Sequence, residues 1–309
     1  MSAMDLQVAT LIGGIEGGGT KFNCVIGHSP DKVLARTSFP TTTPDETLAR
    51  AIEFFKEGEA EYGALRAIGV ASFGPVGLHR QSQYYGYITT APKPHWAYTD
   101  VVGSISRALN VPVAFDTDVN GATLGEGLLG AARGLKNFVY VTIGTGIGAG
   151  VVSNSEIVNG AMHPEIGHML LPRFDEKNDF RGSCPFHGDC LEGLASGPAI
   201  EARWGRKGQD LAPDHPAWAL QARYLAAMCV NLTLCYAPER IILGGGVMSQ
   251  KQLFAMVRTE FTQMLNGYTT LPAAADPENY IVPSALDGHS GELGALIAAE
   301  KLFKQSDYQ

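Results

Sequence analysis

The chain has 309 residues, about twice the size of a common domain, so we expect two lobes and exclude a single small module. Hydrophobic residues make up 45% of it, which is typical of a folded protein and excludes a disordered one. The 23 basic and 31 acidic residues give a formal net charge of −8, and the basic residues form no cluster, so nucleic acid is not an expected partner.

The apolar runs are too short to cross a membrane. Residues 139–143 and 241–243 are typical of these runs and have the length of strands, whereas a membrane-spanning helix needs about 20 apolar residues. Residues 1–10 contain Asp5 and lack both a basic region and a long apolar core, so they do not resemble a secretory signal. We therefore expect no membrane partner and a cytoplasmic location.

The first predicted element is a β-hairpin with a glycine-rich turn. Residues 11–15 and 21–26 are strand-like, and residues 16–20 between them contain three consecutive glycines. The elements that follow, in chain order, are a helix over 45–59 after Pro44, a buried strand over 67–71, a strand over 111–115 and a helix over 119–133.

A second hairpin opens the other half of the chain. Residues 138–143 and 149–152 predict strands on either side of a glycine-rich turn at 144–148. The later elements are a mostly buried helix over 215–236, a strand over 240–243, a glycine turn at 244–246, and helices over 250–265 and 290–304. The alternation of strands and helices predicts an α/β fold.

The spacing of the two hairpins predicts the domain organisation. They lie roughly 120 residues apart, which indicates two lobes of related topology with a boundary near Asp118. We assign the N-terminal α/β lobe to 11–118 and the C-terminal α/β lobe to 119–298. The helix at about 299–309 is a candidate to return to the first lobe.

Glycine-rich turns after strands suggest phosphate binding, because backbone N–H groups can converge on an anion where no Cβ blocks its approach. The chain has such turns at 17–20, 144–148 and 244–246. The first two lead back into strands and not into helices, which argues against a dinucleotide-binding fold, and no P-loop sequence is present. The alternative is that these glycines serve only the geometry of the turns.

Residues 14–21, 143–148 and 243–246 resemble the two phosphate motifs and the adenosine motif of the actin-like ATPase superfamily. Within it, the chain resembles the ROK-family sugar kinases from residue 11 to about residue 300. The resemblance implies two actin-like, ribonuclease H-like lobes with a cleft between them, ATP and Mg²⁺ as cofactors, and a homodimer. It implies ATP contacts from the three glycine-rich segments, at Glu16, Gly17, Gly18, Gly19, Thr20, Lys21, Gly144, Thr145, Gly146, Gly148, Gly244, Gly245, Gly246 and Val247.

One position departs from the family pattern. Members commonly carry Asp where this chain has Glu16, and the resemblance implies that this carboxylate approaches Mg²⁺ through water. A water-mediated contact tolerates the extra methylene of Glu.

Phosphorylating a sugar hydroxyl needs a carboxylate within hydrogen-bond reach of the attacking oxygen. Asp116 and Asp118 are the candidates, at the junction of a predicted strand and helix. The resemblance assigns the catalytic base to Asp118 and implies sugar contacts from Thr117 and Gly74 as well. The alternative for Asp118 is an N-cap of the helix that begins at 119, and the two roles are compatible.

A compact set of cysteines and histidines predicts a structural zinc site in a loop over about 163–192. Thiolates and imidazoles at such spacing form tetrahedral sites that order loops with few apolar residues. The predicted ligands, separated by fifteen, two and two residues, are His168, Cys184, His187 and Cys190. A Cys184–Cys190 disulfide and incidental histidines are the competing interpretations. The other three cysteines are assigned to the core, at Cys24, Cys229 and Cys235.

Sugar recognition is implied by the resemblance. In ROK kinases the positions that match Glu165, His168 and Glu192 bind sugar hydroxyls, and the histidine is also held by zinc. The Cys-x-x-His-x-x-Cys loop, with the segments 72–76 and 85–96, resembles bacterial ROK fructokinases. The predicted reaction is therefore ATP-dependent phosphorylation of D-fructose to fructose 6-phosphate.

The same residues leave other functions open. A ROK glucokinase or mannokinase and an N-acylmannosamine kinase are the near alternatives, and a sugar-binding regulator without catalysis is a distant one. A DNA-binding ROK repressor is disfavoured because about ten residues precede the opening strand and no basic patch is present.

Overall fold

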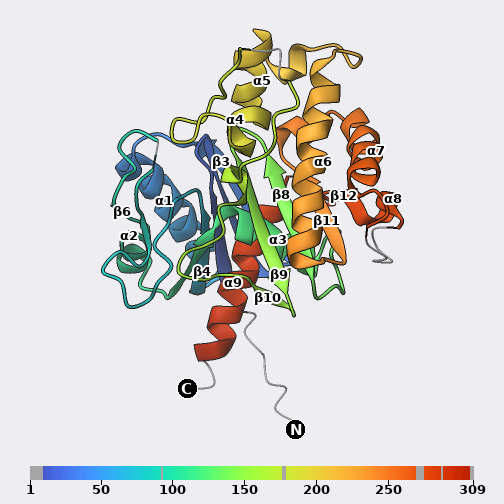
Figure 1. Ribbon diagram of the computed structural model, residues 1–309. Helices are drawn as coiled ribbons and strands as arrows, with labels where there is room; N and C mark the ends of the chain where they lie inside the picture. The colour runs from blue at the N-terminus through green and yellow to red at the C-terminus, as the bar shows by residue number, and fades with distance from the viewer. Residues whose placement is uncertain (1–9, 92, 176–178, 269–274, 287, 307–309) are drawn as a thin grey trace. The chain divides into compact units, whose positions relative to one another are not determined.

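The computed structural model describes residues 10–91, 93–175, 179–268, 275–286 and 288–306 (Figure 1). Some expectations concern residues outside these ranges, namely 1–9, Pro92, 176–178 of the predicted zinc loop and 307–309. Among the helices described, none combines the length and apolar character needed to cross a bilayer.

The contacts divide the chain into two compact units. One consists of Met1–Gly125 with His289–Gln309, and the other is Glu126–Gly288. The helix α3 (Asp118–Leu128) contains both the predicted boundary at Asp118 and the change of unit after Gly125.

The first unit is built on a five-stranded sheet of order β3-β2-β1-β4-β7. The strands β1, β2 and β3 pair antiparallel, and β1, β4 and β7 pair parallel. Their bounds are β1 Leu11–Gly17, β2 Lys21–Ser29, β3 Lys32–Pro40, β4 Leu65–Ser72 and β7 Val113–Thr117. The first predicted hairpin is confirmed. The unit also contains the helices α1 Pro44–Tyr62, α2 Val101–Leu109 and α9 Ser290–Ser306, and the short strands β5 Tyr87–Ile88 and β6 Thr99–Asp100.

The core of this unit follows from the apolar pattern of its elements. The helix α1 buries Leu48, Ala51 and Phe55, which recur at the spacing of one helix face. The helix α9 approaches the sheet so closely that a Cβ at Gly69 of β4 would lie 1.9 Å from the Ala295 carbonyl oxygen. Glycine at this strand position therefore lets the last helix of the chain close the core of the first unit.

The second unit has a five-stranded sheet of order β10-β9-β8-β11-β12. Its strands are β8 Phe138–Ile143, β9 Ile147–Ser153, β10 Glu156–Ile157, β11 Arg240–Gly244 and β12 Ile281–Pro283. The strands β10, β9 and β8 pair antiparallel, whereas β8, β11 and β12 pair parallel, so the two sheets share one topology. The second hairpin and the related topology of the two lobes are confirmed.

Helices and single turns complete the second unit. The long helix α6 Ala217–Tyr236 packs on α7 Gln252–Leu265, and its residues Trp218, Tyr224 and Leu225 are buried. The shorter elements are η1 Ile166–His168, α4 Leu191–Ala195, α5 Gly197–Trp204, η2 Gly208–Asp210, η3 Gly246–Ser249 and α8 Pro277–Tyr280.

Two of the predicted elements illustrate how the bounds in the structure differ from those predicted. The strand predicted over 111–115 is β7, which begins after Pro112, a residue that has no N–H to donate to a ladder. The helix predicted over 119–133 is α3, which ends at Leu128. There the Glu126 carboxylate accepts the Ala131 backbone N–H at 2.8 Å.

Candidate active site and metal centre

The carboxyl ends of three parallel strands of the first unit form one edge. Gly17 of β1 pairs with Ser72 of β4, which in turn pairs with Thr117 of β7. Ligands of open α/β sheets bind at such edges. The register therefore brings the segments that carry Glu16 and Asp118, predicted from separate motifs, to the same edge of the sheet.

Asp118 is the first residue of α3 and is fixed by hydrogen bonds at the start of that helix. Its Oδ1 accepts the Val119 backbone N–H at 2.8 Å, and Thr117 Oγ1 accepts the Asn120 N–H at 3.1 Å. Asp116 binds locally in another way, because its Oδ1 accepts both the Thr117 N–H and Asn120 Nδ2 at 2.7 Å. The predicted N-cap role of Asp118 was wrong: α3 begins one residue earlier than predicted, and Thr117 makes the capping bond to the N–H three residues on.

Glu16 lies close to other negative charges. Its Oε2 accepts a hydrogen bond from Asn23 Nδ2 at 2.7 Å, and the Asn23 amide oxygen accepts from Ser38 Oγ at 2.8 Å. Burial raises the pKa of the Glu16 carboxyl, and the charges of Asp118 and Glu292 raise it further, although the bond from Asn23 opposes this shift. A cation bound beside Glu16 would favour its charged form.

The turn between β1 and β2 is held by backbone contacts. The Gly18 N–H donates to the Lys21 carbonyl at 2.9 Å, and Thr41 Oγ1 donates to the Gly18 carbonyl at 2.7 Å. Gly19, Thr20 and Lys21 are exposed, and the space where a Cβ of Gly19 would stand is open. The turn thus has a fixed backbone and an accessible tip.

The other two glycine motifs adjoin each other in the second unit. The strands β8 and β11 are parallel neighbours, so the turn after β8 and the turn after β11 leave the same end of the sheet. Gly245 has a φ of 87°, and a Cβ there would lie 2.5 Å from the Ile143 carbonyl oxygen. Only glycine permits both this backbone conformation and this close approach.

The remaining predicted nucleotide positions fall on these two turns and their flanks. Gly144 donates its N–H to the Gly146 carbonyl at 2.8 Å, and Thr145 at the tip is exposed. Gly148 lies in β9 and pairs with Thr142. Gly244 ends β11, Gly246 is exposed, and Val247 is buried in η3.

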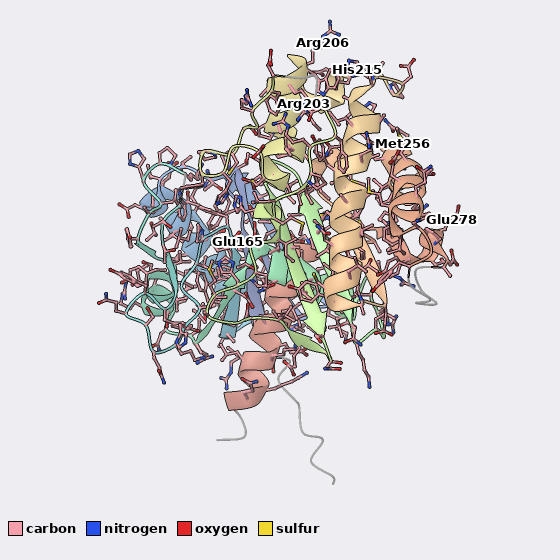
Figure 2. All side chains as sticks on the ribbon, in the orientation of Figure 1. Glu165, Arg203, Arg206, His215, Met256 and Glu278 are labelled. Atoms are coloured by element: carbon pink, nitrogen blue, oxygen red, sulfur yellow. The ribbon has the colours of Figure 1, made fainter. Side chains whose placement is uncertain are left out.

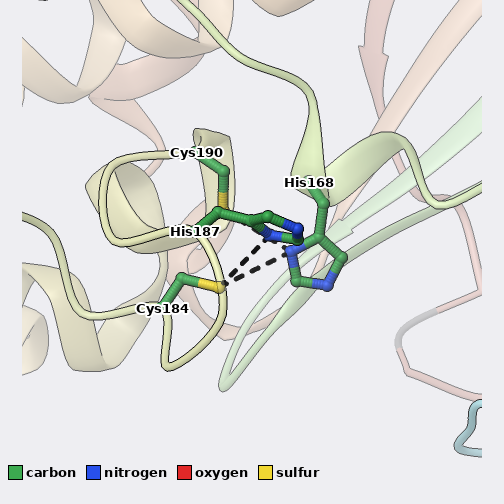
Figure 3. A group of neighbouring side chains, drawn as sticks. All are labelled: His168, Cys184, His187 and Cys190. Carbon is green, nitrogen blue, oxygen red and sulfur yellow. Dashed lines mark hydrogen bonds between the residues drawn. The ribbon is translucent and has the colours of Figure 1, made fainter.

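The four predicted metal ligands converge from three separate segments (Figure 3). His168 ends η1, Cys184 and His187 lie in the following loop, and Cys190 is the N-cap residue of α4. Their ligand atoms all lie within 4.8 Å of one another. The loop is compact, since a Cβ at Gly193 would lie 1.9 Å from the Gly188 carbonyl oxygen.

The distances fit a four-coordinate metal ion. The Nδ1 atom of His168 lies 3.5 Å from Cys190 Sγ and 3.8 Å from Cys184 Sγ, and His187 Nδ1 lies 3.7 Å from Cys184 Sγ. Sulfur and nitrogen ligands of a tetrahedral ion with zinc bond lengths stand about 3.6 Å apart. Burial raises the pKa of the Cys190 thiol to about 11, and a bound cation would stabilise the thiolate.

The five cysteines are free thiols, so the structure does not contain the alternative Cys184–Cys190 disulfide. Cys24 and Cys229 are buried, as predicted, and burial raises the pKa of both thiols. The prediction for Cys235 was wrong, because its side chain is exposed. It lies in the last turn of α6, where Leu234 and Tyr236 are exposed too.

The two predicted sugar-binding carboxylates of this unit differ in their partners. Glu165 Oε1 lies 3.4 Å from His163 Nδ1, and its side chain is 36% exposed (labelled in Figure 2). Glu192 Oε2 accepts the Ile147 backbone N–H at 2.9 Å. Glu165 immediately precedes η1 and stands shortly before the ligand His168 in the chain, whereas Glu192 lies in α4, shortly after the ligand Cys190.

A buried charge network that lies partly in the predicted metal loop was missed by sequence reasoning. Asp175 is paired with Arg203 of α5 and Arg173, and it accepts a hydrogen bond from Tyr224 at 2.8 Å. Arg203, labelled in Figure 2, is only 2% exposed and lies over the Phe180 ring at 4.5 Å. No spacing in the sequence signals this network, because its members come from distant segments.

Comparisons with known proteins agree with this architecture. Residues 12–302 match the ROK family. A fructokinase from Pediococcus pentosaceus is 46% identical, with 96% of this chain and 100% of that protein covered. A fructokinase from Streptococcus mutans is 43% identical over 96% of this chain and 99% of its own.

A solved structure extends the comparison to the fold. The ROK hexokinase from Thermus thermophilus superimposes with a TM-score of 0.79 at 25% identity, covering 96% of this chain and 100% of that one. The family match covers nearly the whole length, and the duplicated sheet topology, the glycine-turned hairpins and the Cys/His cluster agree with it. This chain therefore belongs to the ROK family.

Proposed function

We propose that this protein is an ATP-dependent fructokinase that phosphorylates D-fructose at its 6-hydroxyl. The observation that supports this most is full-length similarity, at 43–46% identity, to proteins named fructokinase. The segments that carry Glu16 and Asp118 meet at one edge of the first unit's sheet, and two glycine turns leave the same end of the second unit's sheet. Both arrangements agree with such a reaction.

In the proposed reaction, the fructose 6-oxygen attacks the γ-phosphorus of ATP. The bond between that phosphorus and the β–γ bridging oxygen breaks, ADP leaves, and the hydroxyl proton passes to the Asp118 carboxylate. The hydrogen bond from the Val119 N–H to Asp118 Oδ1 keeps this carboxylate oriented, and holding a base in place is a large part of its catalytic effect.

The phosphates of ATP are proposed to bind backbone N–H groups of the turns at 17–20 and 144–148, with 244–247 along the adenosine. Mg²⁺ would neutralise phosphate charge when bound, with Glu16 oriented toward its water by Asn23. The exposed tips of the turns at Gly19 and Thr145 leave their N–H groups accessible to a ligand.

The metal of the Cys/His cluster is proposed to be one structural zinc ion per chain. Two thiolates and two imidazoles at these distances suit zinc better than Mg²⁺, which prefers oxygen ligands. Zinc would fix the ring of His168, which with Glu165 and Glu192 is proposed to bind fructose hydroxyls. Thr117 and Gly74 complete the proposed sugar contacts.

The proposal includes a homodimer, which the family resemblance implies, and a cytoplasmic location. Both can be measured, the dimer by sedimentation and the location by fractionation.

Substrate identity can be tested in a coupled assay that offers fructose, glucose, mannose and N-acetylmannosamine in competition. We expect fructose to give the highest kcat/KM. A preference for any of the other three would replace the proposed substrate, and tight sugar binding without ATP turnover would indicate a regulator.

A further inference from the structure

The turn between β8 and β9 is held by a carboxylate from the segment that follows the last metal ligand. The Ile147 N–H, at the first residue of β9, donates to Glu192 Oε2 at 2.9 Å. Ile147 is only 4% exposed. A hydrogen bond to a charged acceptor in such surroundings is stronger than one between neutral groups, and its loss leaves a buried donor without a partner.

The same segment contacts the turn at two further points. A Cβ at Gly146 would lie 2.7 Å from Glu192 Oε2, so a side chain at residue 146 would require the carboxylate to move. At the other end, the Gly197 N–H donates to the Gly144 carbonyl at 2.8 Å. Residues of α4 and α5 therefore contact both ends of this turn.

The metal centre is linked to these contacts. A Cβ at Gly167 in η1 would lie 1.7 Å from the Ile147 carbonyl oxygen, so η1 packs against the same residue whose N–H is bound by Glu192. The ligand atoms of His168 in η1 and Cys190 at the start of α4 lie 3.5 Å apart. A metal ion at the cluster would thus join the two segments on either side of Ile147.

We infer that Glu192 is a positioning residue for the phosphate-binding turn at 144–148, in addition to its proposed contact with the sugar. This inference rests on the proposed function. A carboxylate accepts about four hydrogen bonds, so Glu192 can hold the Ile147 N–H and still bind sugar hydroxyls. Because one carboxylate serves both, binding of sugar and binding of nucleotide are coupled.

The test compares two carboxylates that share the proposed sugar contact but differ at the turn. The affinity for a non-hydrolysable ATP analogue with Mg²⁺ is measured by calorimetry without sugar, in wild type, Glu192→Ala and Glu165→Ala. We expect Glu192→Ala to weaken nucleotide binding on the order of tenfold, the effect of one charged hydrogen bond. Glu165→Ala should weaken fructose binding but leave nucleotide affinity in the absence of sugar unchanged.

A second readout reports on the turn itself. The Ile147 amide should exchange its hydrogen faster in Glu192→Ala than in wild type, and Glu192→Gln, which retains an acceptor oxygen, should restore part of the protection. Gly146→Ala should weaken nucleotide binding more in wild type than in Glu192→Ala, because the added methyl meets the carboxylate only in wild type. Additive effects of the two substitutions would contradict the inference.

Failure of the inference is distinguishable from failure of the proposed function. The inference alone would be overturned by the following result. The wild-type protein phosphorylates fructose, and both Glu192→Ala and Glu192→Gln keep the wild-type nucleotide affinity and the wild-type exchange rate at Ile147. A wild-type protein that does not phosphorylate fructose would overturn the proposed function. Metal content is measured for each variant, and if Glu192→Ala loses its metal, the comparison is made with Glu192→Gln.

Discussion

At the scale of single residues, the structure gives Asp118 and Asp116 different surroundings although they are two positions apart. Asp116 Oδ1 accepts the Thr117 N–H and a hydrogen bond from Asn120 Nδ2, whereas Asp118 Oδ1 accepts the N–H of Val119, the residue that follows it.

Replacing Asp118 by Asn is expected to reduce kcat by 10²-fold or more while fructose binding survives, because the amide keeps the shape of the side chain but cannot take the proton. Steady-state kinetics and calorimetry with fructose measure the two effects. Retained turnover would refute the assignment of the base.

The raised pKa of Glu16 predicts a pH-dependent effect on stability. A carboxyl group whose folded-state pKa is raised stabilises the fold fully below its unfolded pKa, near 4.5, and this contribution is lost as pH rises through the folded pKa. Glu16→Gln removes the charge and keeps an acceptor for Asn23, so without Mg²⁺ and ATP it should raise the melting temperature at neutral pH. The gain should disappear below pH 4.5, and an equal gain at every pH would contradict this explanation.

At the scale of elements, the Cys/His cluster joins three segments that backbone hydrogen bonds also link, from the Leu191 N–H to the Met169 carbonyl and from the Ser183 N–H to the Gly193 carbonyl, each at 2.9 Å. The element η1 is a single turn, and α4 spans only Leu191–Ala195. Elements this short are not stable alone, so their positions depend on contacts with the rest of the unit, and the cluster is one of these contacts.

Replacing Cys184 by Ser is therefore expected to remove the metal and to raise the KM for fructose. Elemental analysis should find about one zinc per wild-type chain and little in the variant. The matched control is Cys235→Ser, because Cys235 is an exposed thiol away from the cluster. If Cys184→Ser kept its zinc, or if the control lost it, the ligand set would be wrong.

At the scale of the whole molecule, the chain enters the second unit after Gly125 and returns to the first unit at His289. The last helix, α9, therefore completes a core whose strands β1 and β4 lie at the other end of the sequence. Leu296 of α9 and Leu225 of α6 are both fully buried, one in each unit.

These two leucines allow a test of the division into units. Leu296→Ala should destabilise the first unit by about 2–5 kcal/mol and speed hydrogen exchange in β1 and β4 more than in β8 and β11. Leu225→Ala should have the opposite pattern. Exchange mass spectrometry measures both, and uniform loss of protection in either variant would indicate that the two units unfold together.

The sequence by itself determined the features that depend on residues near each other in the chain. Both hairpins were predictable because a glycine-rich turn between two apolar runs has few other conformations, and the metal ligands were predictable because three of them lie within seven residues. The junction of strand and helix near Asp118 was predictable from the local sequence, although the capping residue is Thr117 and not Asp118.

Tertiary structure alone decided the features that depend on distant residues. The sequence did not predict β3, which is held by its pairing with β2, or the buried pair of Asp175 and Arg203. Nor did it indicate that Glu192 binds the Ile147 N–H, since these residues meet only when α4 packs beside the turn. Turn geometry and ligand spacing are set by local sterics, whereas strand partners and buried contacts are selected by packing and the exclusion of water, which involve the whole chain at once.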